Sequence, residues 1–198
     1  LAIHPVDREA GRLILAANQA EGARPVVGIS VRDWCGWTQY KEVLAQAADE
    51  IVRTYGARIV FLPMQFPEDV RAAESVAARM REPYTVLPGE YTTAELLSLV
   101  GNMDLMIAIR LHALIFAGVM GVPLIGISYD PKIDRFLDSI GEQPAGRLDT
   151  LTAPVLLAAV REKWEHRRAI RQHNATLLKK QRGLAARNAE LAIELLEK

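Results

Sequence analysis

The stretch Leu105-Met106-Ile107-Ala108-Ile109-Arg110-Leu111-His112-Ala113-Leu114-Ile115-Phe116-Ala117-Gly118 predicts a buried strand that runs directly into a packed helix. Arg110 and His112 are the only polar side chains between Asp104 and Ser128, and they fall where the strand gives way to the helix. In open α/β sheets, ligands bind at the carboxyl ends of the strands. We therefore expect Arg110 and His112 to lie at a ligand-binding edge of a sheet.

On both sides of this stretch, apolar segments of strand length alternate with segments of helical period. The predicted strands are Val26–Val31, Arg58–Leu62, Tyr84–Leu87, the segment ending at Ile109, and Pro123–Ser128. The predicted helices are Tyr40–Tyr55, Pro67–Met80, a helix capped by Thr92 or Thr93, Leu111–Met120 and Pro131–Ile140. This alternation predicts an α/β fold with a doubly wound, Rossmann-like parallel sheet and right-handed crossovers. The expected strand order is 3-2-1-4-5, with a crevice between the first and fourth strands.

The pattern changes after Leu151, so we divide the chain into a domain of residues 1–150 and a C-terminal helical extension of residues 151–198. Four apolar residues recur seven apart in the extension: Ile170, Leu177, Leu184 and Leu191. A coiled coil needs a second apolar row, but polar residues fill those positions: Asn174, Gln181 and Asn188. We expect a solvated helical tail or helices that pack on another domain, with a self-associating coiled coil as the third alternative.

Composition excludes several classes of protein. The 198 residues include 24 basic and 24 acidic side chains, so no net positive field favours nucleic acid as a partner. The single cysteine, Cys35, excludes an internal disulfide framework and fits a reducing, cytoplasmic compartment. No segment reaches the roughly 18 unbroken apolar residues of a membrane span. No cluster has metal-ligand spacing, so we expect neither a metal nor a cofactor.

Two arginines follow the two strands that flank the predicted crevice. Arg32 comes after the first strand and Arg110 after the fourth, and planar guanidinium groups bind carboxylates and phosphates well. The helix beginning at Leu111 adds free backbone N–H groups for an anion, and His112 in its first turn could exchange protons. The alternative is structural: both arginines cap carbonyls or pair with acids such as Asp33 and Asp104, and His112 is a core histidine whose hydrogen bonds are satisfied.

A second polar cluster follows the fifth strand. Ser128 and Tyr129 could orient a ligand, or they could cap the next helix and pack the loop. Lys132 lies in the first turn of that helix, where a cation needs an anionic partner, unless it simply reaches into water. Glu90, in the loop after the third strand, is either a general base or a solvated turn carboxylate.

Three motifs in order resemble one known family. Asp104–Ala113 and Gly121–Lys132 are similar to the signature of the polysaccharide pyruvyl transferase family, and Gly28–Arg32 is similar to its arginine-bearing strand. The resemblance spans roughly Pro25 to Ile140 and is greatest to the bacterial CsaB type, which acts on a cell-wall polymer.

The resemblance implies one half of a two-domain, glycosyltransferase-B-like (GT-B-like) enzyme. Such an enzyme transfers an enolpyruvyl unit from phosphoenolpyruvate to an N-acetylmannosamine-type sugar of a lipid-linked precursor, forming a pyruvyl ketal. It implies that Arg32, Arg110, His112 and Lys132 bind phosphoenolpyruvate, with His112 also in acid–base work. Phosphoenolpyruvate would be a substrate, and no separate cofactor is implied.

The resemblance also bears on the extent and location of the protein. We expect this chain to be the C-terminal, donor-binding half, inactive without an N-terminal half that holds the acceptor. We expect it in the cytoplasm, reaching the inner face of the membrane only through its acceptor. Two other readings stay open: half of a nucleotide-sugar glycosyltransferase, and a non-catalytic anion-binding domain.

Overall fold

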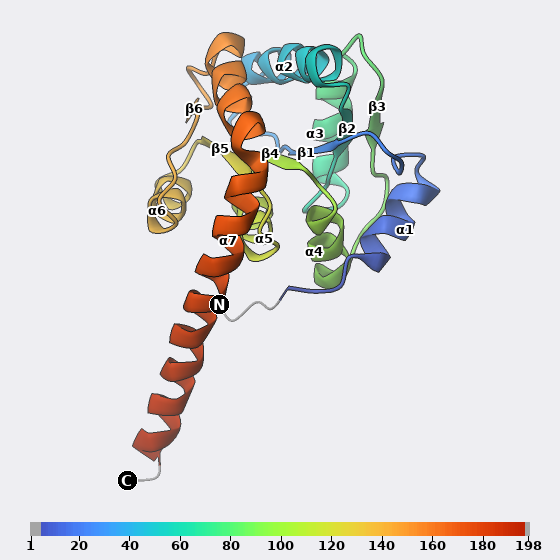
Figure 1. Cartoon of the computed structure of the whole chain (residues 1–198). Coiled ribbons are helices and arrows are strands. Elements are labelled where there is room, and N and C mark those ends of the chain that lie inside the picture. Colours follow the sequence, from blue (N-terminus) through green and yellow to red (C-terminus); the bar gives the residue numbers. More distant parts are fainter. Residues whose placement is uncertain (1–4, 197–198) are drawn as a thin grey trace.

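The computed structural model describes residues 5–196, with side chains described for residues 5–174, and its centre is a parallel six-stranded sheet (Figure 1). The strands are β1 (Val26–Ser30), β2 (Arg58–Phe61), β3 (Tyr84–Val86), β4 (Leu105–Ala108), β5 (Leu124–Ser128) and β6 (Gly146–Arg147). They lie in the order β3-β2-β1-β4-β5-β6. The doubly wound fold and the predicted order of the first five strands are confirmed.

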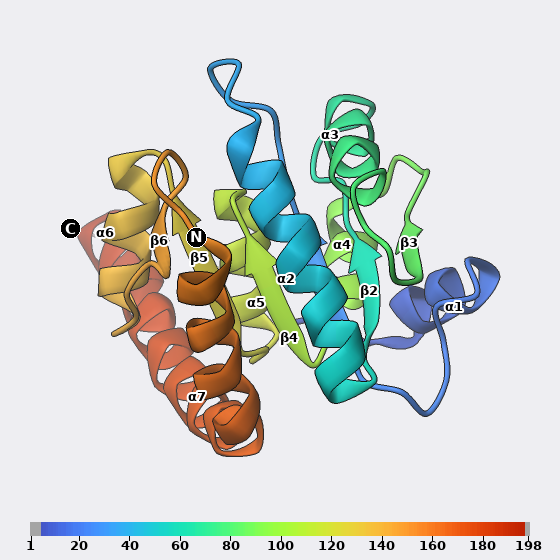
Figure 2. The ribbon, with the colours of Figure 1, turned by 90° about the horizontal axis from the view of Figure 1, so that it is seen from above.

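Helices cover both faces of this sheet. They are α1 (Glu9–Ala17), α2 (Gln39–Tyr55), α3 (Glu68–Ala77), α4 (Thr93–Gly101), α5 (Leu111–Val119), α6 (Pro131–Ser139) and α7 (Ala153–Leu196). Seen from above in Figure 2, α2, α3 and the first turns of α7 lie on one face, with α4 and α5 on the other. Every residue of β1, β4 and β5 is buried, as expected for parallel strands covered on both sides.

The extension forms one continuous helix where the sequence suggested more than one. Near its start, Trp164 of α7 stacks on Tyr55 of α2 with ring centroids 4.6 Å apart. Arg171 then donates a hydrogen bond to the carbonyl of Met103, just before β4 begins. The helix therefore crosses the amino edge of the sheet, which is the edge at which the parallel strands begin. It then continues beyond the α/β body (Figure 1).

The predicted heptad row of the extension falls largely beyond the described side chains. Ile170 lies within them, whereas the side chains of Leu177, Leu184 and Leu191 lie outside the described residues. The coiled-coil alternative therefore stays a prediction. Within the described residues, no helix combines the length and the apolar character needed to cross a membrane.

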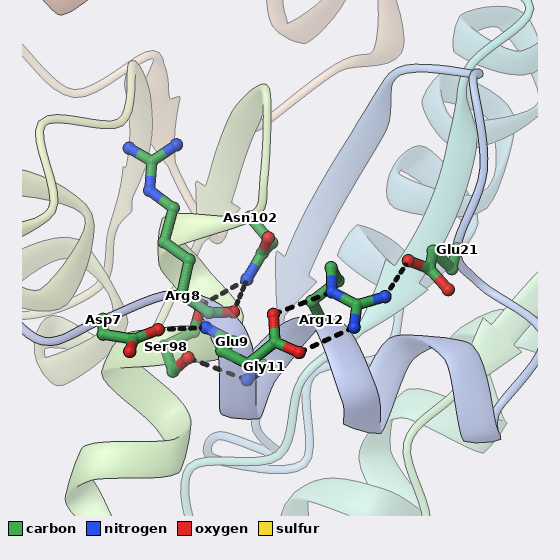
Figure 3. Close-up of polar contacts among 8 residues, drawn as sticks. All are labelled: Asp7, Arg8, Glu9, Gly11, Arg12, Glu21, Ser98 and Asn102. Atoms are coloured by element: carbon green, nitrogen blue, oxygen red, sulfur yellow. Dashed lines mark hydrogen bonds and ion pairs between the residues drawn. The ribbon is translucent and has the colours of Figure 1, made fainter.

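The pattern of the sequence did not predict α1 or β6. β6 has only two residues, too few for a period to be recognised. α1 is held against α4 by specific polar contacts, shown in Figure 3. The backbone N–H of Gly11 donates to the buried hydroxyl of Ser98 at 2.7 Å, and the Asn102 amide donates to the Arg8 carbonyl at 2.8 Å. Such long-range contacts cannot be read from local periodicity.

The N-terminus of α4 settles which threonine caps it. Thr92 is the cap: its hydroxyl accepts from the Glu95 N–H at 3.3 Å, while the Glu95 carboxylate accepts from the Thr92 N–H at 2.8 Å. This reciprocal pair is a capping box, which satisfies two otherwise unpaired backbone donors.

Candidate functional site

Strand register brings the two arginines to one edge of the sheet. β1 and β4 are parallel neighbours in which Ser30 is paired with Ala108, and the Ile109 N–H donates to the Ser30 carbonyl at 3.0 Å. Arg32 and Arg110 each follow this pair by two residues. Both arginines therefore emerge at the carboxyl edge, opposite the edge that α7 crosses.

Arg32 is held between two aromatic rings. Its guanidinium carbon lies 4.9 Å from the ring centroid of Trp34 and 5.6 Å from that of Tyr129, and Nη1 donates to the Tyr129 hydroxyl at 3.1 Å. The two rings contact each other with centroids 4.5 Å apart. Cation–π attraction and this hydrogen bond fix the guanidinium in place. The buried Nε has no hydrogen-bond partner among the described residues.

Lys132 also approaches the ring of Tyr129. Its Nζ lies 5.6 Å from the Tyr129 ring centroid and 3.5 Å from the carboxylate of Asp130. Asp130 caps α6 by accepting from the Lys132 N–H at 2.9 Å, and this backbone hydrogen bond, with the lysine charge, lowers the pKa of Asp130. Arg32, Tyr129 and Lys132 thus form one group, the Tyr129 cluster. Lys132 already has an acidic partner within the protein.

Arg110 belongs to a second group, which we call the Asp69 clamp: Arg110, Asp69 and Gln65. Arg110 Nε donates to Asp69 Oδ2 at 2.8 Å, and Nη2 donates to Gln65 Oε1 at 2.8 Å. Asp69 is only 2% exposed, and it also accepts the backbone N–H groups of Met64 and Gln65, each at 2.9 Å. The clamp fixes the direction of Arg110 and leaves its Nη1 group without a partner among the described contacts.

The acids named in the structural alternative have other partners. Asp33 pairs with Lys41, and Asp104 accepts from the Val26 N–H at 2.9 Å. Arg110 therefore has an acidic partner, as that alternative supposed, but the partner is Asp69 in the first turn of α3.

His112 and Ser128 differ sharply in exposure. His112 is exposed in the first turn of α5, with its ring centroid 6.5 Å from that of Phe116, so it is not a core histidine. Ser128 is completely buried at the end of β5, and so is Ser30 at the end of β1. Neither serine hydroxyl has a partner among the described residues, and the cap of α6 is Asp130.

Three residues of this edge were not singled out from the sequence: Trp34, Gln65 and Asp69. Trp34 lies two residues beyond Arg32, and its position after a strand was the signal that could have found it. Gln65 lies in the loop after β2, and Asp69 lies in the first turn of α3. That loop carries no charged residue, so nothing in its sequence drew attention to it. Among the described residues, no group of three His, Cys, Asp or Glu side chains is arranged to hold a metal ion.

Comparison with known proteins gives one family and a common fold. The family model described as polysaccharide pyruvyl transferase matches residues 15–131, more than half of the chain. A comparison with curated proteins gives no match.

Among solved structures, the chain is similar to a family 9 glycosyl transferase from Veillonella parvula, with a TM-score of 0.62 and 15% identity over 80% of this chain and 51% of that one. It also resembles the C-terminal domain of a group 1 family glycosyl transferase from Francisella tularensis (TM-score 0.63, 12% identity, 89% of this chain and 94% of that one). The ADP-heptose LPS heptosyltransferase II of E. coli is a third (TM-score 0.61, 13% identity, 86% and 53%). These likenesses show a Rossmann-like half of the GT-B fold, and the chain spans about half the length of the first structure.

Proposed function

Because the chain belongs to the polysaccharide pyruvyl transferase family, we propose that it binds phosphoenolpyruvate and serves the transfer of its pyruvyl group to a saccharide. The observation that carries this proposal is the pair of fixed arginines after the neighbouring strands β1 and β4. Phosphoenolpyruvate carries a carboxylate and a phosphate on a three-carbon frame. Two guanidinium groups from adjacent strand ends suit a small anion with two negatively charged groups.

Further positive partners lie at the same edge. The first turn of α5 begins directly after Arg110, and its unpaired backbone N–H groups and positive dipole end favour an anion. Lys132 lies above Tyr129, the residue that also contacts Arg32. We propose that Arg32 and Lys132 contact one anionic end of the donor and that Arg110 and the start of α5 contact the other.

Ketal formation requires the site to support several bond changes and proton transfers. Two sugar hydroxyl oxygens form bonds to the central carbon of phosphoenolpyruvate, the bond from that carbon to the phosphate oxygen breaks, and the methylene carbon gains a proton to become a methyl group. Each of the two hydroxyls loses one proton. One of these protons is matched by the proton that the methylene carbon gains, and the other leaves with the phosphate. No oxidant, reductant or water is consumed.

His112 is the group at this edge best suited to move these protons. Its ring is exposed in the first turn of α5, two residues from Arg110, which supports a role for the imidazole beside a donor held by Arg110. The guanidinium groups and Lys132 stabilise the departing phosphate by charge. An N-acetylmannosamine-type, lipid-linked acceptor and a cytoplasmic location are parts of the proposal that rest on the family alone.

The test is phosphate release from phosphoenolpyruvate by the full-length protein in the presence of a saccharide acceptor. His112→Ala should lower the rate at least 100-fold, in line with the usual contribution of a general acid or base of roughly 10²–10⁴. The binding of phosphoenolpyruvate should change less than the rate. Unchanged turnover in His112→Ala would remove the catalytic assignment of His112. It would favour the alternative in which this domain binds an anion but takes no part in the chemistry. Protection against heat by a nucleoside diphosphate, with none by phosphoenolpyruvate, would instead favour a nucleotide-sugar glycosyltransferase.

A further inference from the structure

A cavity of about 230 Å³ opens beside the Asp69 clamp. The loops after β2 and β3 form its walls, so it lies at the same carboxyl edge as the two arginines. Its lining residues are Pro63, Met64, Gln65, Phe66, Gly89, Glu90, Tyr91 and Leu96. Glu90, which the sequence offered as a general base or a turn carboxylate, belongs to this wall.

The lining favours a neutral ligand rich in hydroxyl groups. Among the described residues that line the cavity, none is Lys or Arg, so the Glu90 carboxylate would repel a phosphate. Glu90 and the Gln65 amide offer planar hydrogen-bonding groups to hydroxyls. Phe66 is 46% exposed, and its ring and that of Tyr91 offer apolar faces. A sugar ring combines hydroxyls at its rim with apolar C–H faces.

The size of the cavity fits one ring. Sites for drug-sized ligands measure about 300–1,000 Å³, and this cavity is smaller. It would take a single sugar residue, with the rest of a longer saccharide outside.

Gln65 connects this cavity to the donor arginine. Its side chain lines the cavity, and its Oε1 accepts from Arg110 Nη2 at 2.8 Å. A sugar ring in the cavity would therefore contact Gln65, whose side chain in turn contacts the Arg110 guanidinium proposed to hold the donor. We infer that this cavity binds the sugar ring whose hydroxyls receive the pyruvyl group, with Glu90 as hydrogen-bond acceptor to one hydroxyl. The acceptor would then contact this half of the enzyme as well as the N-terminal half that the family resemblance implies. This inference rests on the proposed function.

The experiment uses the full-length protein and free N-acetylmannosamine as the probe. Saturation-transfer NMR should detect sugar binding to the wild type, and Phe66→Ala and Glu90→Gln should each reduce the sugar signal at least fivefold. Glu68→Gln is the matched control: it removes an exposed carboxylate of the neighbouring helix α3 that does not line the cavity, and it should leave the signal unchanged. The affinity for phosphoenolpyruvate, measured by calorimetry, should stay within threefold in all three variants, which also shows that they are folded.

Two results would overturn the inference: no sugar signal with the wild type, or equal signals from the wild type and Phe66→Ala. Displacement of the sugar by uridine diphosphate would assign the cavity to a nucleotide instead. Failure of the proposed function has a separate signature, since phosphoenolpyruvate would then fail to bind while the sugar signal and its loss in the variants persisted.

Discussion

Asp69 is the residue that determines where Arg110 points. Its buried carboxylate takes one guanidinium N–H and two backbone N–H groups, so the loop after β2 and the arginine after β4 share one anchor. Removing one member of a buried ion pair leaves an uncompensated charge, which is more costly than losing an exposed pair. The clamp therefore connects the stability of the fold to the geometry of the candidate site.

Asp69→Ala should lower the free energy of unfolding by about 3 kcal/mol, the magnitude expected when a buried charge loses its partner. Urea denaturation of the variant and the wild type measures this difference. Glu68→Ala, one residue earlier, breaks only an exposed ion pair with Arg71 and should cost less than about 1 kcal/mol. Equal losses in the two variants would mean that the clamp has no special role.

Much of the candidate site could be predicted from residue order alone, because parallel strands bring their carboxyl ends to one edge. Residue order places Arg32, Arg110, Tyr129 and Lys132 after particular strands. It could not find the Asp69–Arg110 pair, whose partners lie 41 residues apart and meet only once β2 and β4 flank β1. It also could not distinguish exposed His112 from buried Ser128, because the local pattern around both is apolar.

At the scale of elements, α1 depends on a close approach to α4 that only glycine permits. A Cβ on Gly11 would lie 2.4 Å from the backbone nitrogen of Leu99, and backbone atoms cannot move aside as a flexible side chain can. The Gly11 N–H meanwhile satisfies the buried Ser98 hydroxyl. This helix was missed by periodicity because its placement depends on contact with a distant segment.

Gly11→Ala should therefore destabilise the protein by about 1–3 kcal/mol or more, the usual range for overpacking, although alanine is the better helix former. Ala10→Gly on the exposed side of the same helix should cost only about 0.5–1 kcal/mol. Thermal unfolding of both variants makes the comparison. A Gly11→Ala variant as stable as the wild type would show that α1 does not pack on α4 in this way.

The capping box of α4 gives a prediction about pH. Hydrogen bonds from Thr92, first its backbone N–H and then its hydroxyl, lower the pKa of Glu95 below its ordinary value of 4.5. A carboxyl group with a lowered pKa stabilises the folded state above its ordinary pKa, and this contribution is lost as the pH falls through the lowered value. Glu95→Ala should therefore melt at a lower temperature than the wild type at pH 7, and the difference should shrink below pH 4. A difference that stays constant down to pH 3 would contradict this assignment.

At the scale of the whole molecule, the two edges of the sheet have different surroundings. α7 crosses the amino edge, where Arg171 contacts Met103, and the polar groups described above lie at the carboxyl edge. The strand order and the position of the polar groups at the carboxyl edge were predictable, because alternating strands and helices with right-handed crossovers permit few arrangements. The continuity of α7 was not, since Pro154 and the change in composition after Leu151 gave no sign of a single helix of 44 residues.

Arg32 and Arg110 together form the proposed site for phosphoenolpyruvate. Calorimetric titration of the full-length protein with phosphoenolpyruvate tests it most directly, with Arg32→Ala and Arg110→Ala as variants. We expect saturable binding by the wild type that each variant weakens at least tenfold, which corresponds to about 1.4 kcal/mol. Absence of binding at millimolar phosphoenolpyruvate, or equal affinity in the wild type and both variants, would contradict the claim.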